Sequence, residues 1–327
     1  IAINGFGRIG RLTLRNLLAT AGVEVVAIND LTDTATLAQL FKFDSSQGKY
    51  AGSVSTDGTN IVIDGKSIPT FSLKDPSQLP WADLQVDTVL ECTGIFLSRE
   101  KASQHLKAGA KKVILSAPPK DSDIPTIVRG INDDVLANSS ENIISNASCT
   151  TNCLAPVVKI INDNWGIEKG FMSTIHAYTA DQRLQDAPHS DWRRARTAAV
   201  NIVPTSTGAA KALKTVLPEI GNKINASSMR VPVACGSVVE LICLLQKNAT
   251  TAEVNAAFQA AAENGRLKGI LQYSTDELVS CDILGNPHSS IFDSKLTQLQ
   301  DGLLKVTSWY DNEAGYSARM AELAAQW

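Results

Sequence analysis

The stretch "ISNASCTTNCLAP", residues 144–156, contains two cysteines, and thiols in such surroundings could take part in catalysis. Cys149 lies among small and hydroxylated side chains, where a β-branched run gives way to residues suited to the first turn of a helix. The positive end of a helix dipole favours the thiolate, which is the nucleophilic form of cysteine. Cys149 is therefore a candidate nucleophile, whereas Cys153, one turn later and beside Leu154, is expected to be a buried packing residue.

A nucleophilic thiol needs a base, and His176 is the best candidate among the four histidines. The stretch "FMSTIHAYT", residues 171–179, is typical of a strand, which would hold His176 on one face. The other three histidines have different predicted surroundings: His105 lies in a solvated helix, His189 in a polar loop, and His288 before "SSIFD". No pair of His or Cys residues accompanies the two cysteines at metal-ligand spacing, so no metal site is expected.

A second candidate site lies at the start of the chain. The string Gly5-x-Gly7-x-x-Gly10 follows the apolar run "IAIN" and opens a run with leucines at helical spacing. Asp30 ends the next apolar run. This context predicts a dinucleotide-binding fingerprint, in which a helix N-terminus faces the pyrophosphate and the acid accepts hydrogen bonds from the ribose. Because the charge of Asp30 would repel a 2′-phosphate, the expected cofactor is NAD.

The first half of the chain predicts a parallel sheet that positions this fingerprint. Its candidate strands are "IAIN", "VEVVAIND", "DTVLECTG", "KKVILSAP" and "NIISNAS". Helical or loop segments separate these runs, which favours a sheet covered on both faces with ligands at the carboxyl ends of its strands. The residues at those ends are Gly5, Asp30, Thr93, Gly94, Ser116 and Cys149.

The pattern changes after about residue 148. The candidate strands become longer, and they are "FMSTIHAYT", "SSMRVPV", "GSVVELICLLQ", "LVSCDILG" and "LLKVTSWYDN". Fewer helices separate them, which favours a mixed or antiparallel sheet. We therefore expect an α/β chain with a Rossmann-type NAD-binding domain at 1–147, onto which a C-terminal helix at 313–327 packs. An α+β catalytic domain is expected at 148–312.

The composition excludes several classes of protein. The 327 residues exceed what one hydrophobic core organises, and the net charge is −3. This balance argues against a nucleic-acid or anionic-membrane surface as the main function, and no apolar run is long enough to span a membrane. The six cysteines show no CxxC pairing, and Ile1 begins without the basic lead of a signal peptide. A reducing, cytoplasmic location is expected.

A polar loop at residues 180–203 contains four arginines, at positions 183, 193, 194 and 196. Long ordered loops in compact proteins are usually functional, and a solvated basic surface is the alternative. A nucleic-acid patch is disfavoured, because acidic residues are interleaved with the basic ones.

Several motifs together resemble the phosphorylating glyceraldehyde-3-phosphate dehydrogenases over nearly the whole chain. They are "NGFGRIGR", "SNASCTTNCLAP", "HAYT.DQ", "RRAR.AA.NI.P.STGAAKA", "RVPV", "LKGIL" and "SWYDNE.GYS". The resemblance implies that Cys149 attacks the aldehyde and that His176 takes the hydroxyl proton as hydride passes to NAD. It also implies that inorganic phosphate releases the resulting thioester as 1,3-bisphosphoglycerate.

The resemblance also implies binding residues and a homotetramer. Together with the glycine fingerprint and the strand ends, it gives the expected cofactor-binding set Gly5, Gly7, Arg8, Ile9, Gly10, Asp30, Lys74, Thr93, Ser116 and Asn312. Thr179 and Arg230 would hold the substrate phosphate of glyceraldehyde 3-phosphate. Inorganic phosphate would bind to Ser148, Thr150, Arg194, Thr207 and Gly208.

Three alternatives stay open. Erythrose-4-phosphate dehydrogenase, a relative that passes its thioester to water, loses "STG" in the phosphate region, whereas residues 206–208 are intact here. A non-catalytic, RNA-associating role is disfavoured by the intact Cys149 and His176. Leu31 and Pro188 resemble NAD-specific members, whereas Ala187 leaves some use of NADP open.

Overall fold

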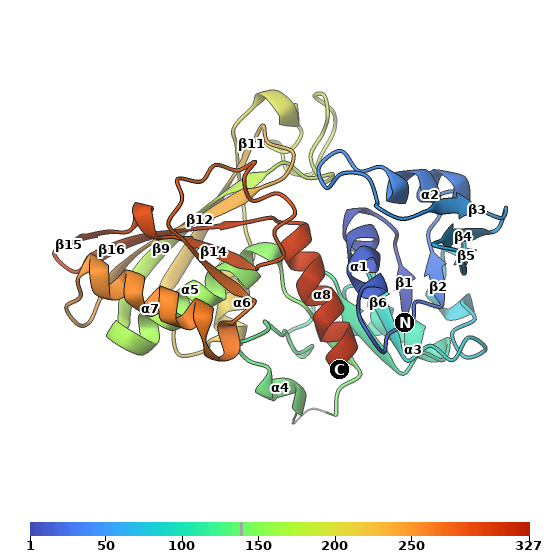
Figure 1. The fold of residues 1–327 in the computed structure, drawn as a ribbon, viewed down its shortest axis with the longest axis horizontal. Coiled ribbons are helices and arrows are strands. Elements are labelled where there is room, and N and C mark those ends of the chain that lie inside the picture. Colours follow the sequence, from blue (N-terminus) through green and yellow to red (C-terminus); the bar gives the residue numbers. More distant parts are fainter. Residues whose placement is uncertain (138–139) are drawn as a thin grey trace. The chain divides into compact units, whose positions relative to one another are not determined.

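The computed structural model describes residues 1–137 and 140–327, and the chain divides into two compact units (Figure 1). Unit 1 comprises Ile1–Ile127, the described part of Asp134–Ala147, and Ser317–Trp327. Unit 2 comprises Val128–Asp133 and Ser148–Tyr316.

Unit 1 is built on an eight-stranded sheet with the order β3-β4-β5-β2-β1-β6-β7-β8. Its strands are β1 (Ala2–Asn4), β2 (Ala27–Asn29), β3 (Val54–Thr56), β4 (Asn60–Ile63), β5 (Lys66–Phe71), β6 (Thr88–Glu91), β7 (Lys112–Leu115) and β8 (Ile143–Ser145). The five predicted strands β1, β2, β6, β7 and β8 pair in parallel, which confirms the prediction for this half of the chain.

An antiparallel meander, β3-β4-β5, extends one edge of this sheet and was not predicted. Asp64 and Gly65 form the two-residue loop between β4 and β5, with φ angles of 50° and 80°. An Asp-Gly pair with both φ angles positive is the preferred turn of a tight hairpin. The first sheet is therefore mixed, because its parallel part carries an antiparallel edge.

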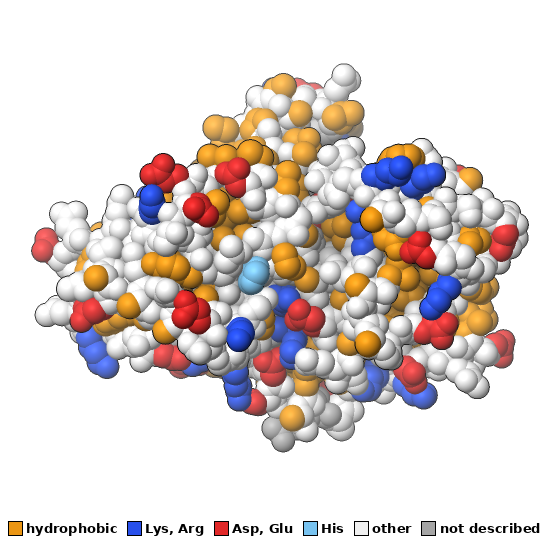
Figure 2. All heavy atoms as spheres, in the orientation of Figure 1, with side chains coloured by type: hydrophobic (Ala, Val, Ile, Leu, Met, Phe, Trp, Pro, Cys, Tyr) orange, Lys and Arg blue, Asp and Glu red, His pale blue; other side chains and the backbone are white. Residues whose placement is uncertain are grey.

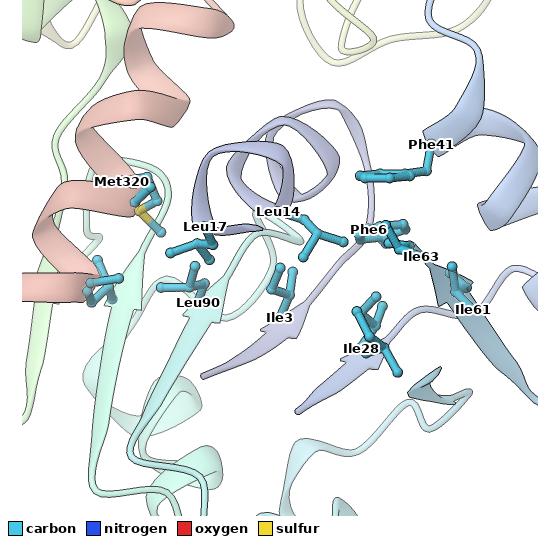
Figure 3. Close-up of a cluster of buried hydrophobic side chains, with 14 of the residues drawn as sticks. Ile3, Phe6, Leu14, Leu17, Ile28, Phe41, Ile61, Ile63, Leu90 and Met320 are labelled. Carbon is cyan, nitrogen blue, oxygen red and sulfur yellow. The ribbon is translucent and has the colours of Figure 1, made fainter. Parts of the chain in front are cut away.

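Side chains of the central strands alternate between two clusters on opposite faces of the sheet. The helices of this part of the chain are α1 (Arg8–Leu18), α2 (Thr34–Lys42), α3 (Arg99–Lys107), α4 (Asp134–Ala137), α8 (Ala314–Gln326) and the 3-10 turn η1 (Pro76–Gln78). Ile3, Leu14 of α1 and Met320 of α8 belong to one buried cluster (Figure 3), whereas the neighbouring Ala2 belongs to a second cluster with Trp81. Both faces are covered, as the apolar strands predict.

Unit 2 contains the second sheet, in the order β10-β11-β9-β12-β16-β14-β13, with β15 paired to β16. Its strands are β9 (Ile167–Ala177), β10 (Val203–Thr205), β11 (Ile224–Val231), β12 (Ser237–Leu245), β13 (Leu271–Ser274), β14 (Ser290–Asp293), β15 (Gln298–Gln300) and β16 (Leu303–Tyr310). The pairs β9–β11 and β13–β14 are parallel and the others antiparallel, so the predicted mixed sheet is confirmed.

The predicted strand "LVSCDILG", residues 278–285, is wrong, because this segment forms turns. The carboxylate of Asp282 accepts a hydrogen bond of 2.7 Å from the backbone N–H of Val279, and Gly285 has a φ of 76°. A short side chain that bonds to nearby backbone competes with strand pairing, and alternating apolar residues do not reveal this competition.

One face of the second sheet is covered by helix α5, which contacts β9, β12, β14 and β16. The helices and 3-10 turns of unit 2 are α5 (Cys149–Trp165), α6 (Ala209–Val216), α7 (Thr251–Glu263), η2 (Ala198–Val200), η3 (Gly265–Leu267) and η4 (Ser294–Leu296). Exposed apolar side chains remain elsewhere on the sheet: Phe171 is 68% exposed and lies opposite Ile242, which is 39% exposed.

Acidic and basic side chains are interspersed over the face of the molecule drawn in Figure 2, in keeping with the small net charge. Within the described residues, none of the helices combines the length and apolar character needed to cross a membrane.

Candidate active site

Cys149 is the first residue of α5, as the sequence predicts. Ser148 caps this helix, because its hydroxyl accepts a hydrogen bond of 3.1 Å from the N–H of Thr151. Ala147, directly before the cap, has a φ of 57°, which is uncommon for a residue other than glycine. This sharp backbone turn lets the chain pass from β8 to α5 within three residues and brings Cys149 to the helix start.

His176 faces the thiol from strand β9. Its Nε2 lies 3.4 Å from the Sγ of Cys149, and its Nδ1 lies 2.7 Å from the carbonyl oxygen of Ala177. The tautomer with its ring proton on Nδ1 donates to this carbonyl oxygen and leaves the lone pair of Nε2 directed at the sulfur. Cys153 is fully buried, with its sulfur 3.6 Å from the hydroxyl of Ser290, as expected of a packing residue.

Burial sets the protonation of this pair. It raises the pKa of Cys149, an effect that the charge of Arg230 and hydrogen bonds to Thr150 oppose. Burial, together with the charge of Arg230, lowers the pKa of His176 to about 3. Desolvation of the sulfur therefore opposes the helix terminus, which favours the thiolate. The lowered pKa of His176 keeps its imidazole neutral, so the ring can accept a proton.

Tyr310, at the end of β16, supports both sides of the pair and was missed by the sequence reasoning. Its buried hydroxyl bonds to the hydroxyls of Thr150 at 2.9 Å and Thr174 at 2.8 Å. Its ring meets the ring of His176 edge-on, with centroids 5.9 Å apart. A tyrosine at the end of a candidate strand, whose hydroxyl needs a partner once buried, is the signal that could have identified it.

Arg230 lies beside His176 because the parallel strands β9 and β11 pair these two residues in register. Its Nη1 contacts Nδ1 of His176 and donates to the carbonyl of Ala177 at 3.2 Å. Arg194 and Asp181 both act electrostatically on Arg230. The structure thus places Arg230 beside the imidazole, and it places Arg194, the other predicted anion-binding arginine, within electrostatic range of Arg230.

The remaining predicted phosphate ligands lie on local turns. Arg194 donates from Nη1 to Asp181 at 2.5 Å and from Nε to Thr205 at 2.7 Å. The N–H of Thr179, just after β9, donates to the side-chain oxygen of Gln182 at 3.3 Å. Arginine and hydroxyl groups of this kind are the usual donors for tetrahedral anions.

Two helix starts carry the other four ligands. Ser148 and Thr150 lie at the start of α5, and Thr207 and Gly208 precede α6. The hydroxyl of Thr207 accepts a hydrogen bond of 3.2 Å from the N–H of Ala209.

A pocket of about 510 Å³ lies at the carboxyl ends of the strands of unit 1. Its lining residues are Asn4, Gly5, Gly7, Asn29, Asp30, Leu31, Leu73, Lys74, Cys92, Thr93, Ile95 and Phe96. Five of the ten predicted cofactor residues are in this lining, whereas Arg8, Ile9, Gly10, Ser116 and Asn312 are not. Arg8 instead forms an ion pair of 2.5 Å with Asp44.

Glycine suits the three positions of the fingerprint for different structural reasons. Gly5 has a φ of 92°, and a Cβ there would lie 2.7 Å from the backbone carbonyl carbon of Cys92. A Cβ on Gly10 would lie 2.2 Å from the carbonyl oxygen of Gly5. Gly7, directly before α1, has no atom within 4 Å of a built Cβ. Open space in front of a helix N-terminus is what a pyrophosphate requires, so these residues fit NAD.

The carboxylate of Asp30 is held at the pocket by two backbone donors. Phe6 N–H donates to one oxygen at 2.7 Å, and Thr32 N–H donates to the other at 2.9 Å. The apolar walls include Leu31 and Ile95, each 57% exposed. Ile95 and Phe96 were missed by the sequence reasoning, although an apolar pair directly after a strand-end "TG" is a usable signal.

Asn312 lies in unit 2, two residues after the end of β16. Its side-chain oxygen accepts hydrogen bonds from the N–H of Gly236 at 3.1 Å and the hydroxyl of Ser237 at 2.8 Å. A backbone N–H can only donate, so the oxygen of the amide must face Gly236.

The predicted solvated environment of His105 is wrong, since its side chain is fully buried. Helix α3 contacts the strands β7 and β8, and the Nε2 of His105 lies 3.0 Å from a carboxylate oxygen of Glu91. The charged residues around His105 in the sequence occupy the outer side of a helix whose inner side is buried.

Unit 1 has a largely parallel sheet with a glycine-lined pocket, and unit 2 has a thiol–imidazole pair. These two features in one chain define an NAD-dependent oxidoreductase. The family model described as "Glyceraldehyde 3-phosphate dehydrogenase, NAD binding domain" matches residues 1–99, and the one described as its "C-terminal domain" matches residues 148–312.

Relatives agree with these matches. The chain is 56% identical to a protein of Mycobacterium avium named glyceraldehyde-3-phosphate dehydrogenase. The matched region covers 99% of this chain and 97% of the relative. It is 52% identical to a protein of that name from Clostridium pasteurianum, over 98% and 96% of the two chains. The chain therefore belongs to the glyceraldehyde-3-phosphate dehydrogenase family. This membership confirms the resemblance, the α/β fold class, the enzyme class and NAD as cofactor.

Proposed function

We propose that this chain oxidises D-glyceraldehyde 3-phosphate, with NAD and inorganic phosphate, to 1,3-bisphosphoglycerate through a thioester on Cys149. The observation that carries the proposal is the 3.4 Å approach of the Cys149 sulfur to Nε2 of His176, in the segment matched by the family's C-terminal domain. The reaction is a step of glycolysis and, in reverse, of gluconeogenesis.

The chain's own residues account for the covalent steps. His176 Nε2 takes the thiol proton as the sulfur of Cys149 attacks the aldehyde carbon, and it passes this proton to the aldehyde oxygen, which gives a hemithioacetal and frees Nε2 again. His176 then takes the hydroxyl proton of that adduct as the carbon is oxidised to a thioester. NAD, when bound, supplies the hydride acceptor. The N–H of Cys149, at the helix start, is available to the developing oxyanion.

Two anions must be held during this sequence. Thr179 and Arg230 bind the phosphate of the substrate. Arg230 lies beside the imidazole of His176, so it brings a positive charge close to the reacting carbon. Ser148, Thr150, Arg194, Thr207 and Gly208 bind the attacking inorganic phosphate. Arg194 would exchange part of its pairing with Asp181 for the incoming anion, since a guanidinium carries five donors.

The cofactor belongs to the first part of the chain in this proposal. Residues 1–147 with the helix at 313–327 form the dinucleotide-binding domain, and residues 148–312 form the catalytic domain. The compact units of the fold, with their boundaries near residues 147 and 316, support this division. The pocket lined by Gly5, Gly7, Asp30 and Thr93 supports the cofactor assignment, to which Arg8, Ile9, Gly10, Lys74, Ser116 and Asn312 are added.

The phosphate requirement tests the function. NADH formation from glyceraldehyde 3-phosphate should require inorganic phosphate or arsenate, and turnover that ignored both would refute the phosphorylating reaction. Erythrose-4-phosphate dehydrogenase is not favoured, because the relatives carry the glyceraldehyde-3-phosphate name and residues 206–208 retain "STG". A higher kcat/KM for erythrose 4-phosphate than for glyceraldehyde 3-phosphate would favour the erythrose-4-phosphate dehydrogenase instead.

A homotetramer is part of the proposal. Its support is apolar surface that one chain leaves exposed: Phe171 and Ile242 on the second sheet, and Leu184 and Trp192, 80% and 86% exposed, in the 180–203 loop. Light scattering on the purified protein tests it, and a monomeric mass would refute it. The six free cysteines support a reducing, cytoplasmic location, which fractionation of the source cells would test.

A further inference from the structure

A cluster of buried polar side chains lies beside the cofactor pocket of unit 1 and takes no part in the steps above. At its centre is Glu91, the last residue of β6, which is fully buried. One carboxylate oxygen accepts from the side-chain N–H of Asn4 at 2.6 Å and from Nε2 of His105 at 3.0 Å. The other accepts from the backbone N–H of Thr93 at 2.8 Å and from the Thr93 hydroxyl. Four donors therefore meet one carboxylate.

His105 is fixed in one orientation behind this carboxylate. The indole N–H of Trp81 donates to its Nδ1 at 3.0 Å, and both side chains are fully buried. An indole N–H only donates, so Nδ1 must be the acceptor and Nε2 must carry the proton that points at Glu91. The ring of Phe96, a residue of the pocket wall, meets the imidazole edge-on with centroids 6.2 Å apart.

The groups that Glu91 holds are pocket residues. The Thr93 hydroxyl donates to the carboxylate and accepts from the N–H of Ile95 at 3.1 Å, which sets the course of the loop after β6. Asn4 accepts from the amide of Asn29 at 2.7 Å, and Asn29 in turn binds both backbone groups of Leu73. All five of these residues line the pocket, whereas Glu91 and His105 do not.

We propose that Glu91 and His105 are positioning residues for NAD binding: they hold Thr93, Asn4 and the loop to Ile95 in the shape that the cofactor meets, without touching it. The proposal rests on the assignment of this pocket to NAD. A carboxylate suits the place because it accepts at all four positions. A glutamine there would turn an N–H₂ group toward one pair of donors and leave them unpaired.

The first experiment separates positioning from folding. Glu91→Gln should raise the Kd for NAD about tenfold, the size of one disrupted buried hydrogen-bond pair. The KM for glyceraldehyde 3-phosphate and kcat at saturating NAD should stay within about twofold. Thr88→Val, a buried polar change at the other end of β6, is the matched control and should leave the Kd unchanged.

Conservative and disruptive changes at His105 provide the second measurement. His105→Gln retains a side-chain donor, so it should bind NAD more tightly than His105→Phe, which has none. Equal NAD affinity in both variants and the parent, with only a lower Tm, would overturn the proposal. The same result for Glu91→Gln would overturn it as well.

A double-mutant cycle tests the route through Thr93. Thr93→Val should weaken NAD binding by itself, and adding Glu91→Gln should cost little more, because both changes break the same link. Fully multiplicative effects would overturn the route. If Glu91→Gln does not fold, Thr93→Val still decides, since unchanged affinity in that variant refutes the proposal. A parent protein that binds no NAD would instead refute the pocket assignment itself.

Discussion

Two buried histidines in this molecule do opposite things with the same side chain. His105 has both ring nitrogens committed, one to Trp81 and one to Glu91, and neither partner takes part in the proposed reaction. His176 commits only Nδ1, while Nε2 faces the sulfur of Cys149 at 3.4 Å. A closed set of hydrogen bonds fixes shape, whereas an open lone pair beside a thiol supports chemistry. Burial alone does not distinguish a structural histidine from a catalytic one; the partner of the second nitrogen does.

The two cysteines of α5 provide the largest test of this contrast. Cys149→Ser should lower kcat/KM by about 10⁴-fold or more, because a hydroxyl beside a neutral imidazole is a far weaker nucleophile. Cys153→Ser, the matched control on the same helix, should stay within a few-fold of the parent. Steady-state NADH formation measures both, and near-normal rates for Cys149→Ser would rule out the thioester.

The histidines themselves give the next largest difference. His176→Gln should lower kcat by about 10²- to 10⁴-fold, the usual contribution of a positioned base. His105→Gln should leave kcat at saturating NAD within about twofold and act on NAD affinity instead. If both variants lost kcat alike, the distinction between an open and a closed histidine would fail for this enzyme.

Arg230 tests whether the open site also binds an anion. Arg230→Lys keeps the charge but loses the planar fork, so the KM for glyceraldehyde 3-phosphate should rise about tenfold. Arg193→Lys, at an exposed position of the 180–203 loop, is the control and should change little. An unchanged KM in Arg230→Lys would remove this arginine from the substrate phosphate site.

The last test concerns stability at acid pH rather than activity. The pKa of His176 is depressed to about 3 in the folded chain, against about 6.5 when unfolded. The unfolded chain therefore binds a proton that the folded chain does not. The contribution of His176 to the free energy of unfolding is fully present above about pH 6.5 and is lost as the pH drops toward 3. The slope from this group is about 1.4 kcal/mol per pH unit. Urea unfolding of His176→Gln should show a shallower loss between pH 6.5 and 4, and an identical slope would contradict the assignment.

The sequence predicted the residues that local patterns encode. Asp30 follows a strand and the glycine string, and Cys149 begins a helix, so both were found from their neighbours in the chain. Tyr310 and the burial of His105 were missed, because their partners Thr174 and Trp81 come from distant segments whose arrangement depends on strand order. Periodicity reveals which face of an element is apolar, but not which other element lies against that face.

The fingerprint glycines show what a single methyl group would do at each position. At Gly10 a Cβ would meet the carbonyl oxygen of Gly5, and at Gly5 it would meet the backbone of Cys92, so alanine at either place opposes folding. At Gly7 a Cβ would meet nothing. Gly7→Ala is therefore the candidate separation-of-function allele, in genetic terms: its product should fold like the parent, so a loss of dinucleotide binding in it could not be ascribed to misfolding. Alanine at Gly5 or Gly10 does not allow this separation.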